Sequence, residues 1–226
     1  MLNLDPILIV IAGANGSGKT TLTMDVLAHK WLDGCVYINP DNIALDIFGD
    51  WNSPDAVLAA AKYAEEARER CLQSRENMAF ESILSTPEKV DFIRRAKMKG
   101  YFVRLFYVGT NKPSINAARV ANRMLEGGHE VPLSKILSRY SNSLLHCPQV
   151  TAIVDRAYFF DNSVENEKHK LLFRTVNGEI ARIYCDLQAH KWASELLRVI
   201  SHTRDPAHRD TDNTMKKITE EDSFVP

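Results

Sequence analysis

Apolar and polar positions along the chain follow two alternating patterns. Continuous apolar runs such as residues 7–13, "ILIVIAG", are typical of strands buried on both faces of a sheet. Such strands are predicted at residues 7–13, 35–41, 78–82, 101–109 and 157–162. Between them, apolar positions three or four residues apart predict helices from about residue 19, from about 54 to 74, 86 to 100, 115 to 147 and 187 to 200. Strands that alternate with helices favour an α/β fold, a three-layer sandwich with a mostly parallel five-stranded sheet and helices on both faces.

The C-terminal part of the sequence departs from this alternation. Asn177-Gly178 separates two short apolar runs, which predicts a β-hairpin with a two-residue turn. After the last predicted helix, residues 203–226 are polar, charged and without periodicity, so we expect them to be disordered. The expected organisation is therefore one domain over residues 1–202 followed by a tail.

Composition excludes few classes but limits the choice of partners. Of 226 residues, 45% are hydrophobic and 25% charged, as in ordinary globular proteins, and the formal net charge is −1. A charge this small gives no reason to expect nucleic acid or a membrane surface as partner. The four cysteines are scattered and no apolar run reaches about 18 residues. These features, and an N-terminus that leads directly into a strand, predict a cytoplasmic protein with reduced thiols.

The first strand leads into a glycine-rich motif. Residues 13–20, "GANGSGKT", fit the phosphate-binding pattern G-x-x-x-x-G-K-[ST] in full. Backbone N–H groups of such a loop point at phosphate oxygens, a lysine reaches the β- and γ-phosphates, and a hydroxyl binds Mg²⁺. The predicted nucleotide ligands are Gly13, Ala14, Asn15, Gly16, Ser17, Gly18, Lys19, Thr20 and Thr21. The motif alone does not separate ATPases, GTPases and small-molecule kinases.

Two further polar groups follow predicted strands and should lie at the same edge of the sheet. Asp41, in "INPDN", can accept the proton of a hydroxyl group that attacks the γ-phosphate. Equally, Asn39 and its neighbours are good turn and helix-cap residues. Glu81 and Ser82 end the third strand, where Glu81 can orient a Mg²⁺-bound water, bind a substrate hydroxyl, or simply cap a turn.

The helical segment at about 113–147 is interrupted by Gly127-Gly128 and predicts a helical lid with a bend between its halves. Arg119 and Arg123 lie four residues apart on its polar side, and Arg139 lies off the apolar stripe of the second half. Arginines supplied by a lid can stabilise the charge on a transferring phosphoryl group. The alternative is that these arginines only keep a helix face hydrated.

Taken in order, "INPDNIA", "FESILS", "ARVANRMLEGGHEVP", "SRYSNSL" and "YFFDNS" after the glycine-rich motif resemble the zeta-toxin family of P-loop kinases. The resemblance covers about residues 5 to 185 and implies a P-loop kinase fold. Members of that family use ATP and Mg²⁺ to phosphorylate a small-molecule hydroxyl, in the best-known cases on the aminosugar of UDP-N-acetylglucosamine. It also implies an antitoxin as partner, although this chain contains no antitoxin-like segment.

The resemblance assigns roles to individual residues. It implies that Lys19 and Thr20 bind the triphosphate and Mg²⁺, that Asp41 is the catalytic base, and that Glu81 lies in the substrate pocket. It makes Arg119, Arg123 and Arg139 the candidates for two lid arginines. His129 joins Asn39 and Ser82 as a candidate substrate ligand, and Asn162 is expected near the adenine. The stretch after Asp41 lacks the longer insertions of toxins that use the UDP-sugar, so the acceptor stays open.

Three classes of function remain at this point. The first is a small-molecule kinase that uses Asp41 as its base. The second keeps this site but phosphorylates another nucleotide, a dinucleotide or a nucleic-acid end. The third is an NTP-binding switch or slow ATPase that acts through a partner protein and needs no base at Asp41.

Overall fold

The computed structural model describes residues 5–27, 34–49, 53–125 and 131–202. The predicted bend at Gly127-Gly128, the candidate ligand His129 and the predicted disorder of residues 203–226 lie outside the described residues. Among the helices in these ranges, none combines the length and apolar character that crossing a bilayer requires.

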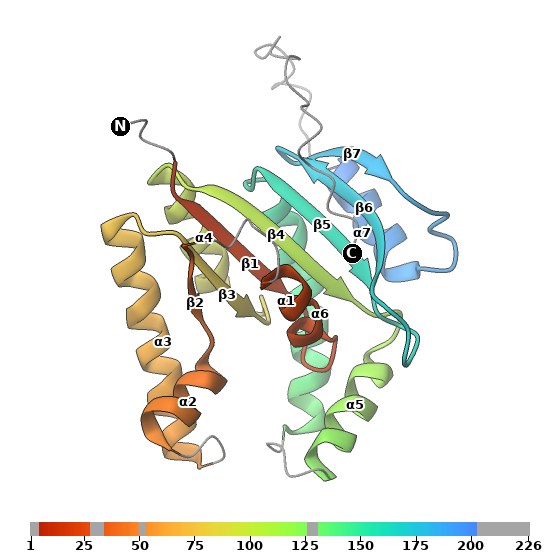
Figure 1. Ribbon diagram of the computed structural model, residues 1–226. Helices are drawn as coiled ribbons and strands as arrows, with labels where there is room; N and C mark the ends of the chain where they lie inside the picture. Colours follow the sequence, from red (N-terminus) through yellow and green to blue (C-terminus); the bar gives the residue numbers. More distant parts are fainter. Residues whose placement is uncertain (1–4, 28–33, 50–52, 126–130, 203–226) are drawn as a thin grey trace.

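The predicted α/β fold is confirmed, with one seven-stranded sheet at its centre (Figure 1). The strands are β1 (Ile7–Ala12), β2 (Val36–Ile38), β3 (Met78–Ser82), β4 (Phe102–Gly109), β5 (Arg156–Asp161), β6 (Lys170–Val176) and β7 (Glu179–Ile183). Their order is β2-β3-β1-β4-β5-β6-β7. The first five run parallel, whereas β6 and β7 pair antiparallel. The predicted hairpin therefore extends the sheet from five strands to seven, because β6 pairs with β5.

Seven helices connect and cover the strands in the described residues. They are α1 (Lys19–Leu27), α2 (Pro40–Phe48), α3 (Pro54–Ser74), α4 (Pro87–Met98), α5 (Pro113–Leu125), α6 (Leu133–Thr151) and α7 (Lys191–His202). Helix α2 was not predicted. It begins at Pro40 because the Asn39 side chain caps it, and it therefore cuts the predicted second strand short at Ile38.

Two apolar clusters pack on the two faces of the sheet. The larger one joins alternate residues of β1, β3, β4 and β5 to α3, α4, α6 and α7, and includes Leu105, Phe159 and Trp192. The smaller one joins the remaining alternate residues to α1 through Leu22 and Val26. Because Cys147 and Val150 of α6 belong to the larger cluster, the second half of the predicted lid is also part of the core.

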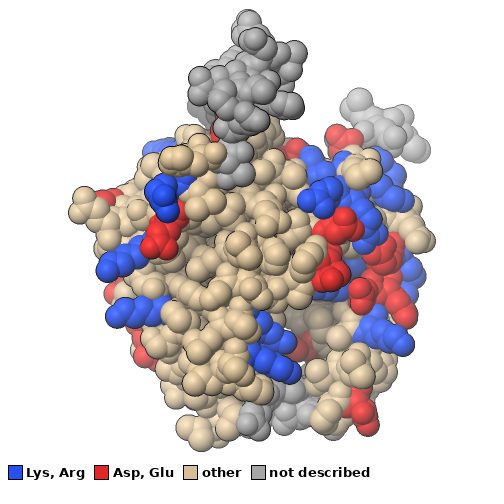
Figure 2. All heavy atoms as spheres, turned by 180° about the vertical axis from the view of Figure 1, so that it is seen from behind, with Lys and Arg blue, Asp and Glu red and all other residues tan. Residues whose placement is uncertain are grey.

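The carboxyl ends of the parallel strands meet at one edge of the sheet, between α2 and α3 on one side and α5 and α6 on the other (Figure 1). Away from this edge, charged side chains of α3 and α4 interleave on the surface, visible from behind in Figure 2. A groove of about 470 Å³ opens between these two helices. Its lining contains none of the functional residues predicted from the sequence, so we place the candidate site at the strand ends.

Candidate functional site

The glycine-rich loop joins β1 to α1 with a backbone that only glycine accommodates. Gly16 and Gly18 have φ values of +74° and +94°. A Cβ atom on Gly16 would lie 2.5 Å from the Asn116 carbonyl oxygen, and one on Gly18 would lie 2.2 Å from Asn162 Nδ2. The loop is therefore closely packed on its outer side, as a phosphate cradle at a helix N-terminus requires.

Lys19, the first residue of α1, is the cation around which the other charged groups of the site lie. Its Nζ donates a hydrogen bond to the Ala14 carbonyl oxygen at 3.0 Å, so the side chain folds back over the loop. Burial lowers the pKa of Lys19 to about 8; Glu81 and Asp41 act to raise that pKa, and Arg123 and Arg139 to lower it. Two acids and two arginines therefore surround the predicted triphosphate lysine.

This electrostatic setting predicts how ATP binding depends on pH. The lysine attracts phosphate only while protonated, and a bound triphosphate raises its pKa above the free value of about 8. ATP affinity should be constant from about pH 7 to 8 and then fall, by at most about tenfold per pH unit. Titrations of ATP between about pH 7 and 10 check this, with Lys19→Met as control, which should bind weakly without the fall. An equal fall in the control would contradict the assignment.

Glu81, at the end of β3, is held next to the loop by hydroxyl groups. It accepts hydrogen bonds from Thr20 Oγ1 at 3.3 Å, from Thr23 Oγ1 at 2.9 Å and from the Tyr37 hydroxyl at 3.0 Å. The Thr20 hydroxyl and the Glu81 carboxylate thus lie side by side. Mg²⁺ is commonly bound by one or two such oxygen groups together with substrate phosphates. This pair fits that role, although no group of three or more His, Cys, Asp or Glu side chains in the described residues is placed to hold a metal ion.

Asp41 lies in the first turn of α2. The Asn39 side chain accepts a hydrogen bond from the Asp41 backbone N–H at 2.8 Å and donates one to the Tyr37 hydroxyl at 3.0 Å. Asn39 is therefore a helix cap, the alternative that the sequence left open, and its amide also binds the Tyr37 hydroxyl. The Asp41 side chain is exposed and close enough to act on the pKa of Lys19.

Two predicted residues make contacts that differ from the expected ones. Ser82 is buried, and its Oγ accepts a hydrogen bond from the Leu84 backbone N–H at 3.0 Å, so it fixes the turn after β3. Arg119 donates to the carbonyl oxygens of Asn162 and Val164 at 2.8 Å and 3.4 Å. The guanidinium of Arg119 therefore binds the loop after β5.

The loop after β5 also contacts the glycine-rich loop directly. Asn162 Nδ2 donates to the Ser17 carbonyl oxygen at 2.8 Å.

The two remaining candidate arginines are connected to the same loop. Arg139 of α6 donates a hydrogen bond to Asn15 Oδ1 at 3.3 Å, whereas Arg123 acts on the pKa of Lys19. Thr21 lies exposed on the first turn of α1. The structure thus brings together the predicted loop residues, Asp41, Glu81, Arg123, Arg139 and Asn162.

Two residues that the sequence did not single out complete the support of the loop. Asn116 of α5 is fully buried, donates to the Asn15 carbonyl oxygen at 2.7 Å and accepts a hydrogen bond from Thr110. His169 Nε2 lies 3.1 Å from the Gly18 carbonyl oxygen, and burial lowers the pKa of His169. Only the asparagine had a usable signal, since it is a polar residue on the apolar side of a predicted helix.

Asn116→Ala should weaken both the fold and nucleotide binding. It removes the donor to the Asn15 carbonyl and the buried acceptor of the Thr110 hydroxyl, which keeps only the Lys112 carbonyl oxygen at 3.5 Å, and we expect a loss of about 2–3 kcal/mol in the free energy of unfolding. Because the loop backbone loses its support, ATP affinity should fall about tenfold as well. Urea unfolding and ATP titration measure the two effects. Asn122→Ala, an exposed position on the same helix, is the control and should change neither; equal behaviour of both variants would contradict this role.

Comparisons with known proteins agree with this geometry. A family model described as Zeta toxin matches residues 3–184. An uncharacterized protein of Haemophilus influenzae is 30% identical over 135 residues, which cover 58% of this chain and 91% of that relative.

Two solved structures illustrate the similarity of fold. The AvrRxo1-ORF1:-ORF2 complex with ATP matches with a TM-score of 0.63 and 19% identity over 86% of this chain. This chain spans 64% of the length of the chain it matches there. The PezAT toxin-antitoxin system of Streptococcus pneumoniae matches with a TM-score of 0.53 and 18% identity, covering 85% of this chain and 88% of the other. At these identities the likeness shows the fold alone.

Proposed function

This chain belongs to the zeta toxin family of P-loop kinases, and from that premise we propose that it transfers the γ-phosphate of ATP to a hydroxyl group of UDP-N-acetylglucosamine or a related nucleotide sugar. One observation carries the proposal. Asp41, which a hydrolase or switch would not need, stands with Glu81, Arg123 and Arg139 around Lys19. A carboxylate beside the triphosphate lysine is what an attacking acceptor hydroxyl requires.

In the proposed reaction Asp41 takes the proton of the acceptor hydroxyl while the oxygen of that hydroxyl forms a bond to the γ-phosphorus. The bond between that phosphorus and the bridging oxygen of the β-phosphate breaks, and ADP leaves. Lys19 and the N–H groups of the loop hold the triphosphate, and Arg123 and Arg139 stabilise the charge on the transferring group. Thr20 and Glu81 would hold Mg²⁺, which neutralises phosphate charge when bound.

We propose different roles for the three arginines, and each substitution has an expected signature. Arg123→Ala and Arg139→Ala should each lower kcat about 100-fold, because these charges act on the transition state. Arg119→Ala should mainly raise KM for ATP, since Arg119 supports the loop that contacts Ser17. Steady-state kinetics of the three variants measure this. A larger loss of kcat for Arg119→Ala than for the other two would contradict the assignment.

One expectation about the setting is supported by a comparison, and a second comes from the proposed substrates. The Streptococcus pneumoniae neighbour is described as a toxin-antitoxin system, which supports an antitoxin as the partner of this chain. Such a partner would act by covering the nucleotide or substrate site. ATP and nucleotide sugars are cytoplasmic metabolites, so we also propose that the protein acts in the cytoplasm.

The experiment that tests the proposal supplies several acceptors in parallel. The full chain is incubated with Mg²⁺, ATP labelled at the γ-phosphate, and UDP-sugars, other nucleotides, dinucleotides or short oligonucleotides. We expect label on the UDP-sugars, and on UDP-N-acetylglucosamine before its relatives. Label on an oligonucleotide or a dinucleotide alone would overturn the acceptor. Free phosphate alone would overturn the kinase reaction itself.

A further inference from the structure

Tyr37, in the middle of β2, forms a hydrogen-bond link between two parts of the candidate site. Its hydroxyl donates to Glu81 Oε1 at 3.0 Å and accepts from Asn39 Nδ2 at 3.0 Å. The Asn39 side chain in turn accepts from the Asp41 backbone N–H at 2.8 Å. One tyrosine thus connects the carboxylate of the proposed metal site with the capped turn that carries the proposed base.

The direction of these hydrogen bonds is fixed from one end. A backbone N–H can only donate, so the Asp41 N–H makes the Asn39 side-chain oxygen the acceptor and leaves the Asn39 amide nitrogen as a donor. The Tyr37 oxygen must accept from that nitrogen, and its single proton is therefore directed to Glu81. The chain of donors runs from the Asp41 backbone to the Glu81 carboxylate.

The two threonine hydroxyl groups at Glu81 hold it less firmly than Tyr37 does. Thr23 Oγ1 lies 2.9 Å from Glu81 Oε1 and also 2.9 Å from the Lys19 carbonyl oxygen, and its one proton cannot be donated fully to both. Thr20 Oγ1 lies 3.3 Å from the other carboxylate oxygen, Oε2. Tyr37 therefore holds Oε1, while Oε2 is next to Thr20, the other residue proposed to bind Mg²⁺.

Burial increases the effect that the loss of this hydrogen bond would have. Asn39 is buried, and Tyr37 and Glu81 are half-buried, so water replaces a lost partner only in part. A hydrogen bond to a carboxylate is also stronger than one between neutral groups. Groups that orient a metal ligand in this way commonly change metal affinity about 10- to 100-fold when they are removed.

We propose that Tyr37 is a positioning residue, whose hydroxyl fixes the Glu81 carboxylate in the orientation that binds Mg²⁺ and ties that carboxylate to the turn of Asp41. The inference rests on the part of the proposed function in which Thr20 and Glu81 hold Mg²⁺. Without the hydroxyl the carboxylate can rotate. Nucleotide binding that depends on the metal should then weaken, whereas binding without the metal should not.

Binding of the β,γ-imido analogue of ATP, which cannot transfer its γ-phosphate, tests this on the full chain. Titration calorimetry with Mg²⁺ and with EDTA gives two affinities, and their ratio is the Mg²⁺-dependent gain. In Tyr37→Phe we expect this gain to fall about tenfold or more, while the affinity in EDTA stays within about threefold of the wild type.

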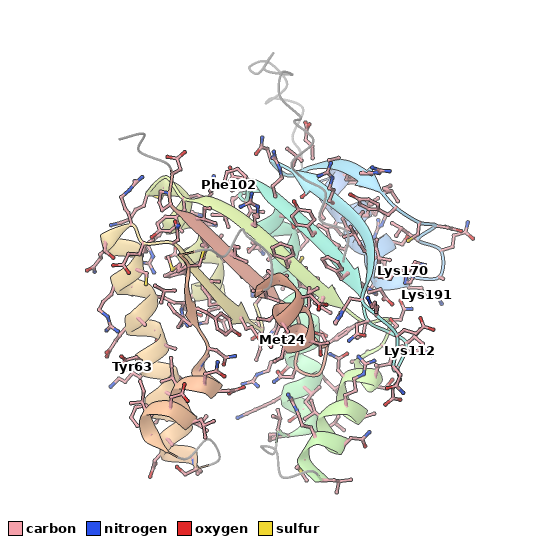
Figure 3. All side chains as sticks on the ribbon, in the orientation of Figure 1. Met24, Tyr63, Phe102, Lys112, Lys170 and Lys191 are labelled. Atoms are coloured by element: carbon pink, nitrogen blue, oxygen red, sulfur yellow. The ribbon has the colours of Figure 1, made fainter. Side chains whose placement is uncertain are left out.

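The matched control is Tyr63→Phe, which removes the hydroxyl of an exposed tyrosine. Tyr63 lies on α3, well apart from α1 and its Met24, which follows the glycine-rich loop (Figure 3). The control should therefore leave both the affinity in EDTA and the Mg²⁺-dependent gain unchanged.

A second variant separates positioning from a general structural role. Asn39→Ser keeps a side-chain oxygen at the helix cap but removes the amide donor, so the Tyr37 proton is no longer directed to Glu81 alone. We expect a smaller loss of the Mg²⁺-dependent gain, about threefold, and no further loss when Tyr37→Phe is combined with it than in Tyr37→Phe alone. Losses that multiply in the double variant would contradict the chain of donors.

The outcomes distinguish this inference from the proposed function. An unchanged Mg²⁺-dependent gain in Tyr37→Phe would overturn the positioning role, and so would an equal loss of affinity with and without Mg²⁺. No gain in the wild type would overturn the metal site and the inference with it. A reduced gain in Tyr37→Phe, with free phosphate as the only labelled product of the wild type, would support the inference while overturning the kinase reaction.

Discussion

Lys19→Ala should reduce kcat/KM for phosphoryl transfer by about a thousandfold or more, equivalent to about 4 kcal/mol of transition-state stabilisation. The side chain of Lys19 folds back over the glycine-rich loop, and both acids and both arginines of the site act on its pKa. The measurement is steady-state kinetics with the acceptor identified in the labelling experiment. Lys62→Ala, which removes an exposed lysine of α3, is the matched control and should leave kcat/KM unchanged.

The same variant should not be less stable. Because burial lowers the pKa of Lys19 to about 8, the folded state carries a cost for the protonated side chain at pH 7, and alanine removes that cost. Thermal unfolding should therefore show a Tm equal to or above that of the wild type. Wild-type phosphoryl transfer by Lys19→Ala would mean that the site is wrongly assigned.

Asp41→Asn should lower acceptor phosphorylation by about 10²- to 10⁴-fold, the usual contribution of a general base. ATP affinity should remain within about threefold of the wild type, since the carboxylate acts on the acceptor and an amide keeps its size and its place in α2. Parallel measurements of ATP binding and of labelled product separate these effects. Asp46→Asn, an exposed acid of the same helix, is the matched control and should behave like the wild type. Unaltered turnover in Asp41→Asn would favour the NTP-binding switch.

The parts of the fold that were predictable are those whose signals are local. The apolar run of β1, the glycine-rich motif and the start of α1 follow one another within about twenty residues, and each is specified by its own sequence. Helix α2 was not predicted because it is short: it has nine residues, begins at Pro40 and is capped at its C-terminus by Gly49. The pattern of Asp41 and its neighbours fits a turn equally well, and only the cap hydrogen bond from the Asp41 N–H to the Asn39 side chain decides between the two.

Non-local contacts could not be predicted in the same way. The pairing of β6 with β5 makes one sheet of seven strands, yet the turn at Asn177-Gly178 specifies only the hairpin itself. The choice among three arginines depended on where Arg119 finds its acceptors, 43 and 45 residues further along the chain. Likewise, His169 supports Gly18 from 151 residues away. Single-sequence patterns contain no information about such distances.

The central claim is that the γ-phosphate of ATP moves to a sugar hydroxyl activated by Asp41. Its most direct test is phosphorus NMR of the full chain with ATP, Mg²⁺ and UDP-N-acetylglucosamine, compared with Asp41→Asn. The proposed function predicts a new phosphomonoester signal coupled to a sugar proton, growing in step with ADP and nearly absent in the variant. Inorganic phosphate growing in step with ADP, at equal rates in both proteins, would contradict it.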